Sequence, residues 1–427
     1  IISKGRVGDH YEWLGGIFGF YKRGSFNVPV NFKQDGIDSL IISNIPSGPV
    51  KLGFRDNSLP LLSRFSTPVW GVALYHQSNY EIDDWSFSAG LRLDFERTAM
   101  SWRSMCNTGV IYTVPMGPRP ITDEIPIQMD DLTNLHNSYL NLLPKVSVSH
   151  RLGNAGQAYV SVAKGYKAGG YNTQMLSDVL QQRLKMTMMD EFRKIMPTLP
   201  TINMAYNPAD MITYKPESSW NYEVGANLWA NDYDMKIDLT AFYIDCRNQQ
   251  LTVFPEGQTT GRMMVNADTR SAGAECAVLW RPVSNLNLCA SYGFTDARFI
   301  SYKDNDGIIN YKNKRVPYAP RNTVFASADY RINVRERLLD AVSVNVNMKG
   351  VGPICWDERN EVKQPFYAQL GASVRLEWSK GSLDFWGENL TGCNFITYYF
   401  VSIGNAFAQQ GKPRRVGVTL RWNFQSK

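Results

Sequence analysis

Residues 215–249 limit the possible folds more than any other segment, because apolar and polar side chains alternate strictly along two arms joined by a turn. The apolar side of the first arm carries Trp220, Tyr222, Val224, Ala226 and Leu228. Successive side chains of a β-strand point to opposite faces, so each arm has one apolar and one polar face. Soluble strands usually have about 5–6 residues, whereas a tilted strand that crosses a bilayer needs roughly 9–11. For this hairpin alone, a long ribbon of a soluble β-sandwich remains the alternative.

The same alternation recurs along the chain, and long and short connections follow one another in turn. We expect about 14 antiparallel strands, from a first strand at Tyr11 to a last one at 414–424. The long connections are expected at about 22–66, 105–136, 167–214, 251–268, 301–320, 350–364 and 391–410. Short turns on one side and long loops on the other are typical of an up-and-down outer-membrane β-barrel. We therefore predict an all-β transmembrane barrel whose lipid face carries Val342, Leu376 and Trp422 and whose wet face carries Asn345, Arg375 and Arg421.

Composition argues against some other classes of protein. Lys and Arg number 45 and Asp and Glu 39, a net charge of +6, and no basic run indicates nucleic-acid binding. No stretch approaches the roughly 18 apolar residues of a transmembrane helix, but barrel strands are only half apolar. The chain begins at Ile1 without a recognisable signal peptide, so we expect a processed protein or a fragment.

The C-terminal part of the chain contains the motifs KGYKAGGYN (164–172), YKPESSWNYEVGAN (214–227), AFYIDCRNQ (241–249), SAGAECAVLWRP (271–282), YAPRN (318–322) and WGENLTGCNF (386–395). As a set, they resemble the barrel of TonB-dependent outer-membrane receptors. Each motif is weak alone, but their order and spacing are specific. Members of this family have barrels of about 22 strands around an N-terminal plug. The resemblance implies that 1–427 is one partial barrel domain, with the plug, the TonB-contacting box and roughly eight first strands outside this chain.

The last strand resembles the C-terminal signal that the barrel-assembly machinery reads, through Gly417, Leu420, Trp422 and Phe424. The family usually ends on the terminal aromatic residue, whereas 425–427 follow it here. The same strand also fits a simpler interpretation, in which its apolar side faces lipid. Both interpretations can hold together.

Aromatic residues of the expected outer loops are the candidates for ligand contact, because their rings offer a large, rigid apolar area to a chelate or a glycan. They are Tyr166, Tyr171, Trp356, Tyr398, Tyr399 and Phe400. The alternative, which we favour slightly, is an aromatic girdle at the level of the lipid headgroups. Basic residues expected in the lumen could steer an anionic ligand, or equally pair with the plug; they are Arg92, Arg375, Arg415 and Arg421.

No metal, cofactor or catalytic signature is evident. The four histidines lack metal-ligand spacing, and 206–216, where haem receptors of the family carry a histidine near an NPNL-type motif, has none. A helix is expected at 174–196, and its methionines Met186, Met188, Met189 and Met196 fit an apolar helix face better than a copper site. An oxidising compartment would allow a disulfide between Cys355 and Cys393, although we expect free thiols. We find no nucleophile elbow, phosphate loop or catalytic dyad and expect no enzyme.

The resemblance implies active uptake of a scarce, large solute across the outer membrane of a Gram-negative cell, most often an iron–siderophore complex. The implied partners are TonB, acting through the plug, the barrel-assembly machinery, outer-membrane lipid and a siderophore-like ligand. A rival is a complete, passive channel of about 14 strands for hydrophobic or small polar solutes, and a structural or adhesin barrel is a third option. A plug with a TonB box encoded upstream of Ile1 would favour the receptor, and a signal peptide directly upstream would favour the channel.

Overall fold

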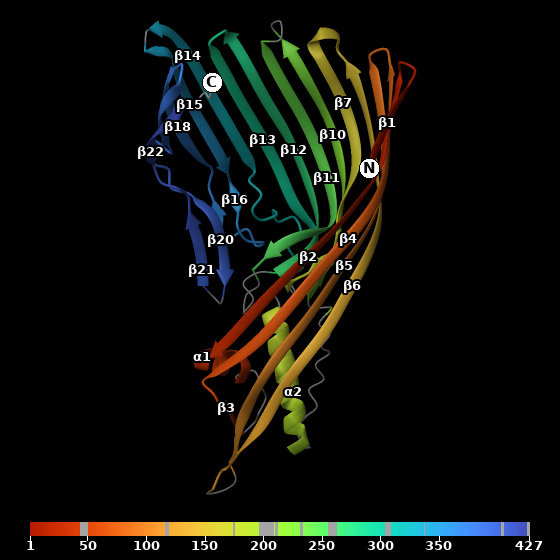
Figure 1. Ribbon diagram of the computed structural model, residues 1–427, viewed down its shortest axis with the longest axis vertical. Coiled ribbons are helices and arrows are strands. Elements are labelled where there is room, and N and C mark those ends of the chain that lie inside the picture. Colours follow the sequence, from red (N-terminus) through yellow and green to blue (C-terminus); the bar gives the residue numbers. More distant parts are fainter. Residues whose placement is uncertain are drawn as a thin grey trace.

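The computed structural model describes residues 1–42, 50–115, 119–173, 176–195, 209, 212–230, 234–254, 263–303, 309–336, 338–402 and 405–424. They form one large curved sheet that continues at one end into a long, narrow arm (Figure 1). The sheet has 16 strands in the order β1-β2-β4-β5-β6-β7-β10-β11-β12-β13-β14-β15-β18-β19-β22, with β3 paired to β5.

The strands follow one another antiparallel in chain order. The first half comprises β1 (Ile2–Val7), β2 (Tyr11–Lys33), β3 (Lys51–Phe54), β4 (Ser58–Ile82), β5 (Trp85–Val114), β6 (Ile121–Arg151) and β7 (Gly156–Lys167). The second half comprises β10 (Glu217–Ala230), β11 (Met235–Val253), β12 (Met263–Val283), β13 (Leu286–Ser301), β14 (Asn322–Glu336), β15 (Leu339–Gly352), β18 (Tyr367–Trp378), β19 (Gly381–Glu388) and β22 (Arg415–Trp422). The predicted antiparallel up-and-down architecture is confirmed. The sequence did not reveal β1, which lacks a clear apolar alternation, or β3, which has only 4 residues.

The smaller elements lie in the long connections at one end of the sheet, except η3, which lies in the short turn between β6 and β7 at the other end (Figure 1). They are the strand pairs β8 (Gly170–Tyr171) with β9 (Thr213–Tyr214), β16 (Ile354–Cys355) with β17 (Lys363–Gln364), and β20 (Ile396–Ser402) with β21 (Asn405–Gln410). The helical elements are α1 (Gln34–Gly36), η1 (Ile37–Ile41), η3 (Gly153–Ala155) and α2 (Leu176–Ile195). No helix among the described residues is long and apolar enough to cross a membrane.

In β5, the apolar side chains lie on the more exposed face of the sheet. Leu91 is 49% and Leu93 41% exposed, whereas the intervening Arg92 and its neighbour Asp94 are half-buried. A soluble sheet would bury the leucines and expose the charges. The inverted pattern fits a wall with hydrocarbon on one side and a polar interior on the other.

In the last strands, the pairing register also separates apolar from polar side chains. Val342 lies beside Leu376, which lies beside Leu383, and Leu383 lies beside Leu420, so one face is continuously apolar. The next row of the opposite face carries Ser343, Arg375, Asp384 and Thr419. Alternation requires Asn345 and Arg421 to share the face of Arg375, and Val342 and Trp422 to share the other face. The predicted division of these residues between one apolar and one polar face is confirmed, and the contact of the apolar face with lipid stays a prediction.

The long connections predicted at 22–66 and 105–136 are wrong over much of their length. The structure extends β2 to Lys33, begins β4 at Ser58, extends β5 to Val114 and begins β6 at Ile121. Proline is usually confined to turns and strand edges, yet Pro29 and Pro60 lie within β2 and β4. The extended strands leave the barrel wall and form the arm seen in Figure 1, which we call the blade: the outer parts of β2, β4, β5 and β6 with β3, α1, η1 and α2.

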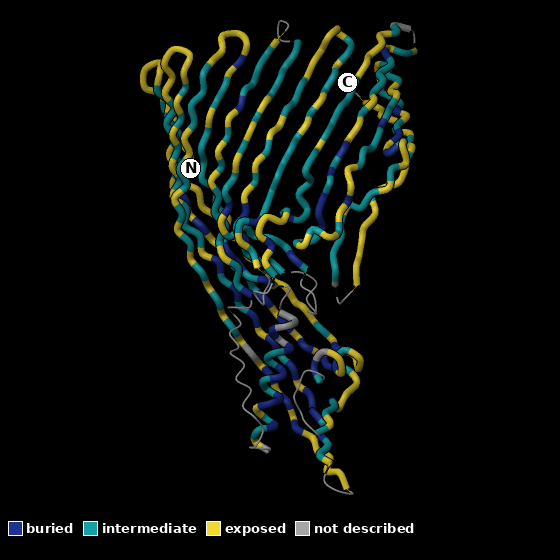
Figure 2. Tube along the Cα trace, turned by 180° about the vertical axis from the view of Figure 1, so that it is seen from behind, coloured by how far each residue is buried: buried dark blue, intermediate teal, exposed yellow. Residues whose placement is uncertain are grey.

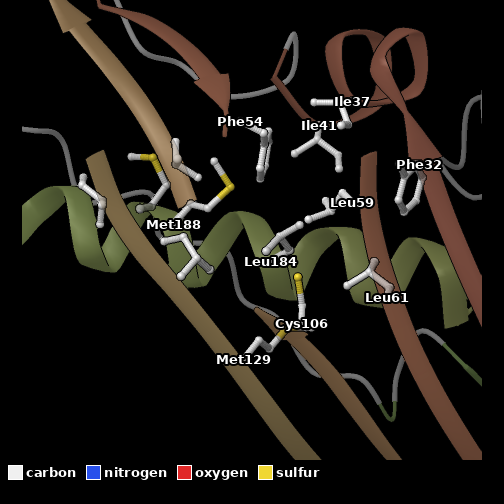
Figure 3. Packing of buried hydrophobic residues seen from close by; sticks show 14 of the residues in the cluster. Phe32, Ile37, Ile41, Phe54, Leu59, Leu61, Cys106, Met129, Leu184 and Met188 are labelled. Atoms are coloured by element: carbon white, nitrogen blue, oxygen red, sulfur yellow. The ribbon is translucent and has the colours of Figure 1, made fainter. Parts of the chain in front are cut away.

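The blade has a hydrophobic core of the kind found in water-soluble domains. Leu59 and Leu61 of β4, Ile127 of β6 and Leu184 and Met188 of α2 are fully buried together. Figure 3 shows the side chains of α2 pointing toward the strands, and Figure 2 shows buried residues concentrated in the blade, while the wall is mostly half-buried or exposed. The predicted helix and its apolar side are thus present, although its expected ends, Gln174 and Met196, lie outside the described residues.

Candidate functional site

An aromatic cavity lies among the long connections at the end of the sheet. Phe254, at the end of β11, packs against Tyr398 and Phe400 of β20 with ring centroids 6.2 and 5.2 Å apart. Tyr318, from the connection between β13 and β14, stacks on Tyr398 at 5.7 Å. The rings of Phe254, Tyr318 and Tyr398 border a cavity of about 330 Å³, and Phe400 supports them from outside its lining. Such a volume is at the low end of the range for small-molecule sites, so it suits one arm of a large ligand.

Tyr318 is held in place and stays neutral at physiological pH. Its hydroxyl donates a hydrogen bond to the backbone carbonyl of Tyr399 at 2.6 Å. Burial, together with the nearby Tyr398 and Glu358, raises the pKa of the Tyr318 phenol above its ordinary value. A neutral, fixed phenol offers the cavity an uncharged aromatic surface.

Of the other candidate ligand-contact residues, one supports the Tyr318 ring and two line a second cavity. Trp356 is 5% exposed and lies edge-on to Tyr318 at 5.4 Å, so it supports that ring from behind. Tyr166 and Tyr171 line a separate cavity of about 820 Å³, together with Arg92 and other residues of the polar face. The structure therefore does not gather all six candidates into one site.

The aromatic girdle does not account for the rings of β20. Tyr398 and Phe400 belong to a two-stranded sheet that is separate from the barrel wall, and they pack on Phe254 and Tyr318. Sequence reasoning missed Phe254 and Tyr318 as cavity residues. Phe254 directly follows a predicted strand, and Tyr318 stands in the YAPRN motif, which was used only for the family resemblance.

The four arginines predicted for the lumen all have carboxylate partners. Arg92 pairs with Asp94, with 2.6 Å between Nη2 and Oδ2, and lies over the Phe18 ring. Arg375 and Arg421 both pair with Asp384, which is 5% exposed. The fourth, Arg415, pairs with Glu388. Paired cations attract an anion less strongly than free ones, so the wall provides a polar lining rather than a strongly basic patch.

The residues of the expected assembly signal lie on both faces of the last strand. Leu420, Trp422 and Phe424 are 64%, 50% and 91% exposed. Gly417 lies beside Trp386 of β19, whose ring covers it. The arrangement fits a membrane-facing last strand, and the recognition by an assembly machine stays a prediction.

The cysteines and the helix methionines have structural surroundings. Cys355 is buried, Cys393 is half-buried, and both are free thiols, so the disulfide considered from sequence does not form. Met188 and Met189 lie in the core of the blade. Among the described residues, no group of three or more His, Cys, Asp or Glu is placed to hold a metal ion.

Comparison with known proteins places this geometry in a family. The family model described as TonB dependent receptor-like, beta-barrel matches residues 5–390. The pesticin receptors of Yersinia enterocolitica and Yersinia pestis are each 25% identical over 285 residues, which cover 66% of this chain and 36% of theirs. The chain thus spans about a third of the length of the curated relatives that it matches.

Solved structures share the fold at low sequence identity. The ferric yersiniabactin uptake receptor of Yersinia pestis has a TM-score of 0.52 at 17% identity, over 98% of this chain and 60% of that one. The ferric preacinetobactin receptor of Acinetobacter baumannii has a TM-score of 0.52 at 12% identity, over 99% and 62%. At these identities the likeness concerns the fold alone. The match of the family model over most of the chain is decisive: the chain belongs to the TonB-dependent receptor family, as part of its β-barrel in the outer membrane of Gram-negative bacteria.

Proposed function

We propose that this chain forms the wall and the outer mouth of a receptor that takes up an iron–siderophore complex by TonB-dependent active transport. The observation that carries the proposal is the aromatic cavity lined by Phe254, Tyr318 and Tyr398 and supported by Phe400, at the mouth of a barrel wall with a polar inner face. Solved structures with this fold include receptors for ferric yersiniabactin and ferripyoverdine. A ring-bearing ferric chelate is the ligand class that suits such a cavity.

The proposal assigns the energy coupling to parts of the receptor outside these residues. TonB would act on a plug, and the wall would supply the path along its polar face, where Asp384 and Glu388 neutralise the arginines. The barrel-assembly machinery is the proposed partner for insertion, through the last strand. We propose no enzymatic role.

The passive channel is not favoured, because residues 5–390 match a receptor barrel family. Among the described residues, β1 and β22 end the sheet without pairing to each other, which does not support a complete small barrel. Nothing in the described surface favours an adhesin over a receptor.

Iron transport in cells that carry the full receptor gene tests the proposal. Deletion of the gene should abolish uptake of radiolabelled iron from at least one member of a panel of phenolate, catecholate and hydroxamate ferric siderophores. Tyr398→Ala and Phe400→Ala should reduce that uptake, whereas Tyr330→Ala, which removes an exposed ring from the apolar face of the wall, should not. Unchanged iron uptake from the whole panel after deletion would rule the function out.

A further inference from the structure

A single asparagine links two of the connections that surround the aromatic cavity. Asn360 lies between β16 and β17, and its Oδ1 accepts a hydrogen bond from the backbone N–H of Arg315 at 2.7 Å. Its Nδ2 donates to the backbone carbonyl of the same Arg315 at 2.9 Å. A carboxamide carries both a donor and an acceptor, so one side chain imitates one step of a β-ladder. We call this arrangement the Asn360 clasp.

The Asn360 side of the clasp is fixed locally. Its backbone has φ +60°, a left-handed conformation that asparagine tolerates better than most residues. Its N–H and its Nδ2 both donate to the carbonyl of Asp357, each at 3.1 Å. The Asp357 carboxylate in turn accepts from the N–H of Val362 at 2.9 Å. These hydrogen bonds fix the conformation of the turn independently of its contact with Arg315.

The residues next to Arg315 are hydrogen-bonded to the end of β13. Val316 donates its N–H to the carbonyl of Ala297 at 3.1 Å, and Phe299 donates to the carbonyl of Lys314 at 3.0 Å. Phe299 is fully buried, in a small core that also contains Val316. The clasp thus ties the connection between β16 and β17 to a rigid part of the wall.

The clasp controls two residues that line the cavity. Tyr318 follows Arg315 by three positions and donates its N–H to the carbonyl of Cys355 at 2.9 Å. Glu358 precedes Asn360 by two positions and lines the same cavity. Releasing Asn360 would remove the tie nearest Glu358 and leave the two connections joined only nearer their other ends, where Tyr318 and Arg321 donate to the carbonyls of Cys355 and Pro353. The position of Glu358 relative to Tyr318 would then be less fixed.

The same two-point pairing recurs around the mouth. Asn172 pairs with both the N–H and the carbonyl of Met264, Asn266 with those of Lys215, and Asn389 with those of Cys393. The mouth is therefore held together by side chains that replace strand pairing where regular strands have ended. Such a scaffold is ordered before a ligand arrives.

We propose that Asn360 is a positioning residue that keeps the aromatic cavity preformed, so that an uncharged ring of the ligand binds without first ordering these connections. The proposal rests on the uptake function above and goes beyond it in specifying the bound group. The described residues that line the cavity include no cationic side chain to pair with an anion, so a neutral ring is preferred over an anionic one. Preorganisation favours affinity because the entropy of ordering the loops has already been lost in folding.

The test uses the purified full-length receptor and two measurements. Hydrogen exchange, followed by mass spectrometry, is compared between the wild type and Asn360→Gly, which keeps the left-handed backbone accessible but removes the clasp. Exchange at 309–321 and 353–364 should become about tenfold faster, because each lost hydrogen bond contributes roughly 0.5–1.5 kcal/mol. Binding of phenol and of benzoate is then measured by saturation-transfer NMR.

Phenol should bind the wild type better than benzoate, and its signal should fall in Asn360→Gly and in Tyr398→Ala. Asn333→Gly, which makes the same change near the short-turn end of β14, should leave both phenol binding and loop exchange unchanged. The proposal is overturned if exchange in the two connections does not rise, if exchange rises equally throughout the sheet, or if phenol binding survives the loss of the clasp. Benzoate binding equal to phenol binding would overturn the preference for a neutral ring. Because these readouts need no transport, failure of iron uptake would refute the proposed function without deciding this inference.

Discussion

At position 417 the neighbouring strand leaves room for glycine alone. A Cβ there would lie 2.3 Å from the Trp386 ring, far inside van der Waals contact. That ring is held by its Nε1–H, which donates to the Thr419 hydroxyl at 3.1 Å. The glycine that the sequence analysis assigned to an assembly signal therefore also has a packing role.

Gly417→Ala should destabilise the folded barrel by about 1–3 kcal/mol, the usual cost of overpacking. Urea unfolding of the full receptor in lipid vesicles, followed by tryptophan fluorescence, measures the change. Gly19→Ala is the matched control, because its Cβ would meet nothing closer than 3.7 Å. A normal stability of Gly417→Ala combined with a low yield of inserted protein would assign this glycine to assembly alone.

Cys106 gives a pH-dependent prediction. The thiol is 4% exposed in the blade, and burial raises its pKa to about 11. Because the fold favours the protonated thiol, this contribution to stability is complete below the ordinary thiol pKa and is lost as pH rises toward about 11. Maleimide should modify Cys106 slowly in the native receptor at pH 8 and rapidly in urea, as detected by mass spectrometry. Fast native modification would show that the blade core opens.

At the scale of elements, α2 and the outer strands depend on each other. Leu184 and Met188 of α2 are fully buried against the outer strands of the blade, whereas Asp190 of the same helix is exposed. Leu184→Ala should cost roughly 2–5 kcal/mol, enough to detach the helix while the wall stays intact. Limited proteolysis should then cut within α2, and Asp190→Ala should stay resistant. Equal resistance of both variants would contradict the packing.

Strands and helices were predicted correctly where a single residue periodicity held along the whole element. Alternation located the wall strands because lipid and lumen impose a period of two, and helical periodicity located α2. Alternation did not predict the outer strands of the blade. Pro29 and Pro60 are residues typical of loops, although antiparallel pairing continues through both. The clustering of Phe254 with Tyr398 depends on how distant connections fold together, and no local pattern encodes that.

At the scale of the whole molecule, two adjacent residues test the orientation of the wall. Leu239 is 41% exposed on the apolar face, and Thr240 lies on the polar face, where its hydroxyl is 3.4 Å from that of Tyr159. Leu239→Arg should destabilise the inserted barrel by about 2–4 kcal/mol if this depth is near the bilayer midplane, whereas Thr240→Arg should be tolerated. Unfolding in lipid vesicles measures both. The opposite ranking would reverse the assignment of the two faces.

The blade owes its shape to its own sealed interior, in which Leu59, Ile127 and Met188 exclude water without help from hydrocarbon. Its geometry is therefore indifferent to bilayer thickness and lipid type. The blade therefore presents a rigid surface of fixed height outside the cell. Changes in membrane composition that tilt or strain the wall would leave the shape of the blade unchanged.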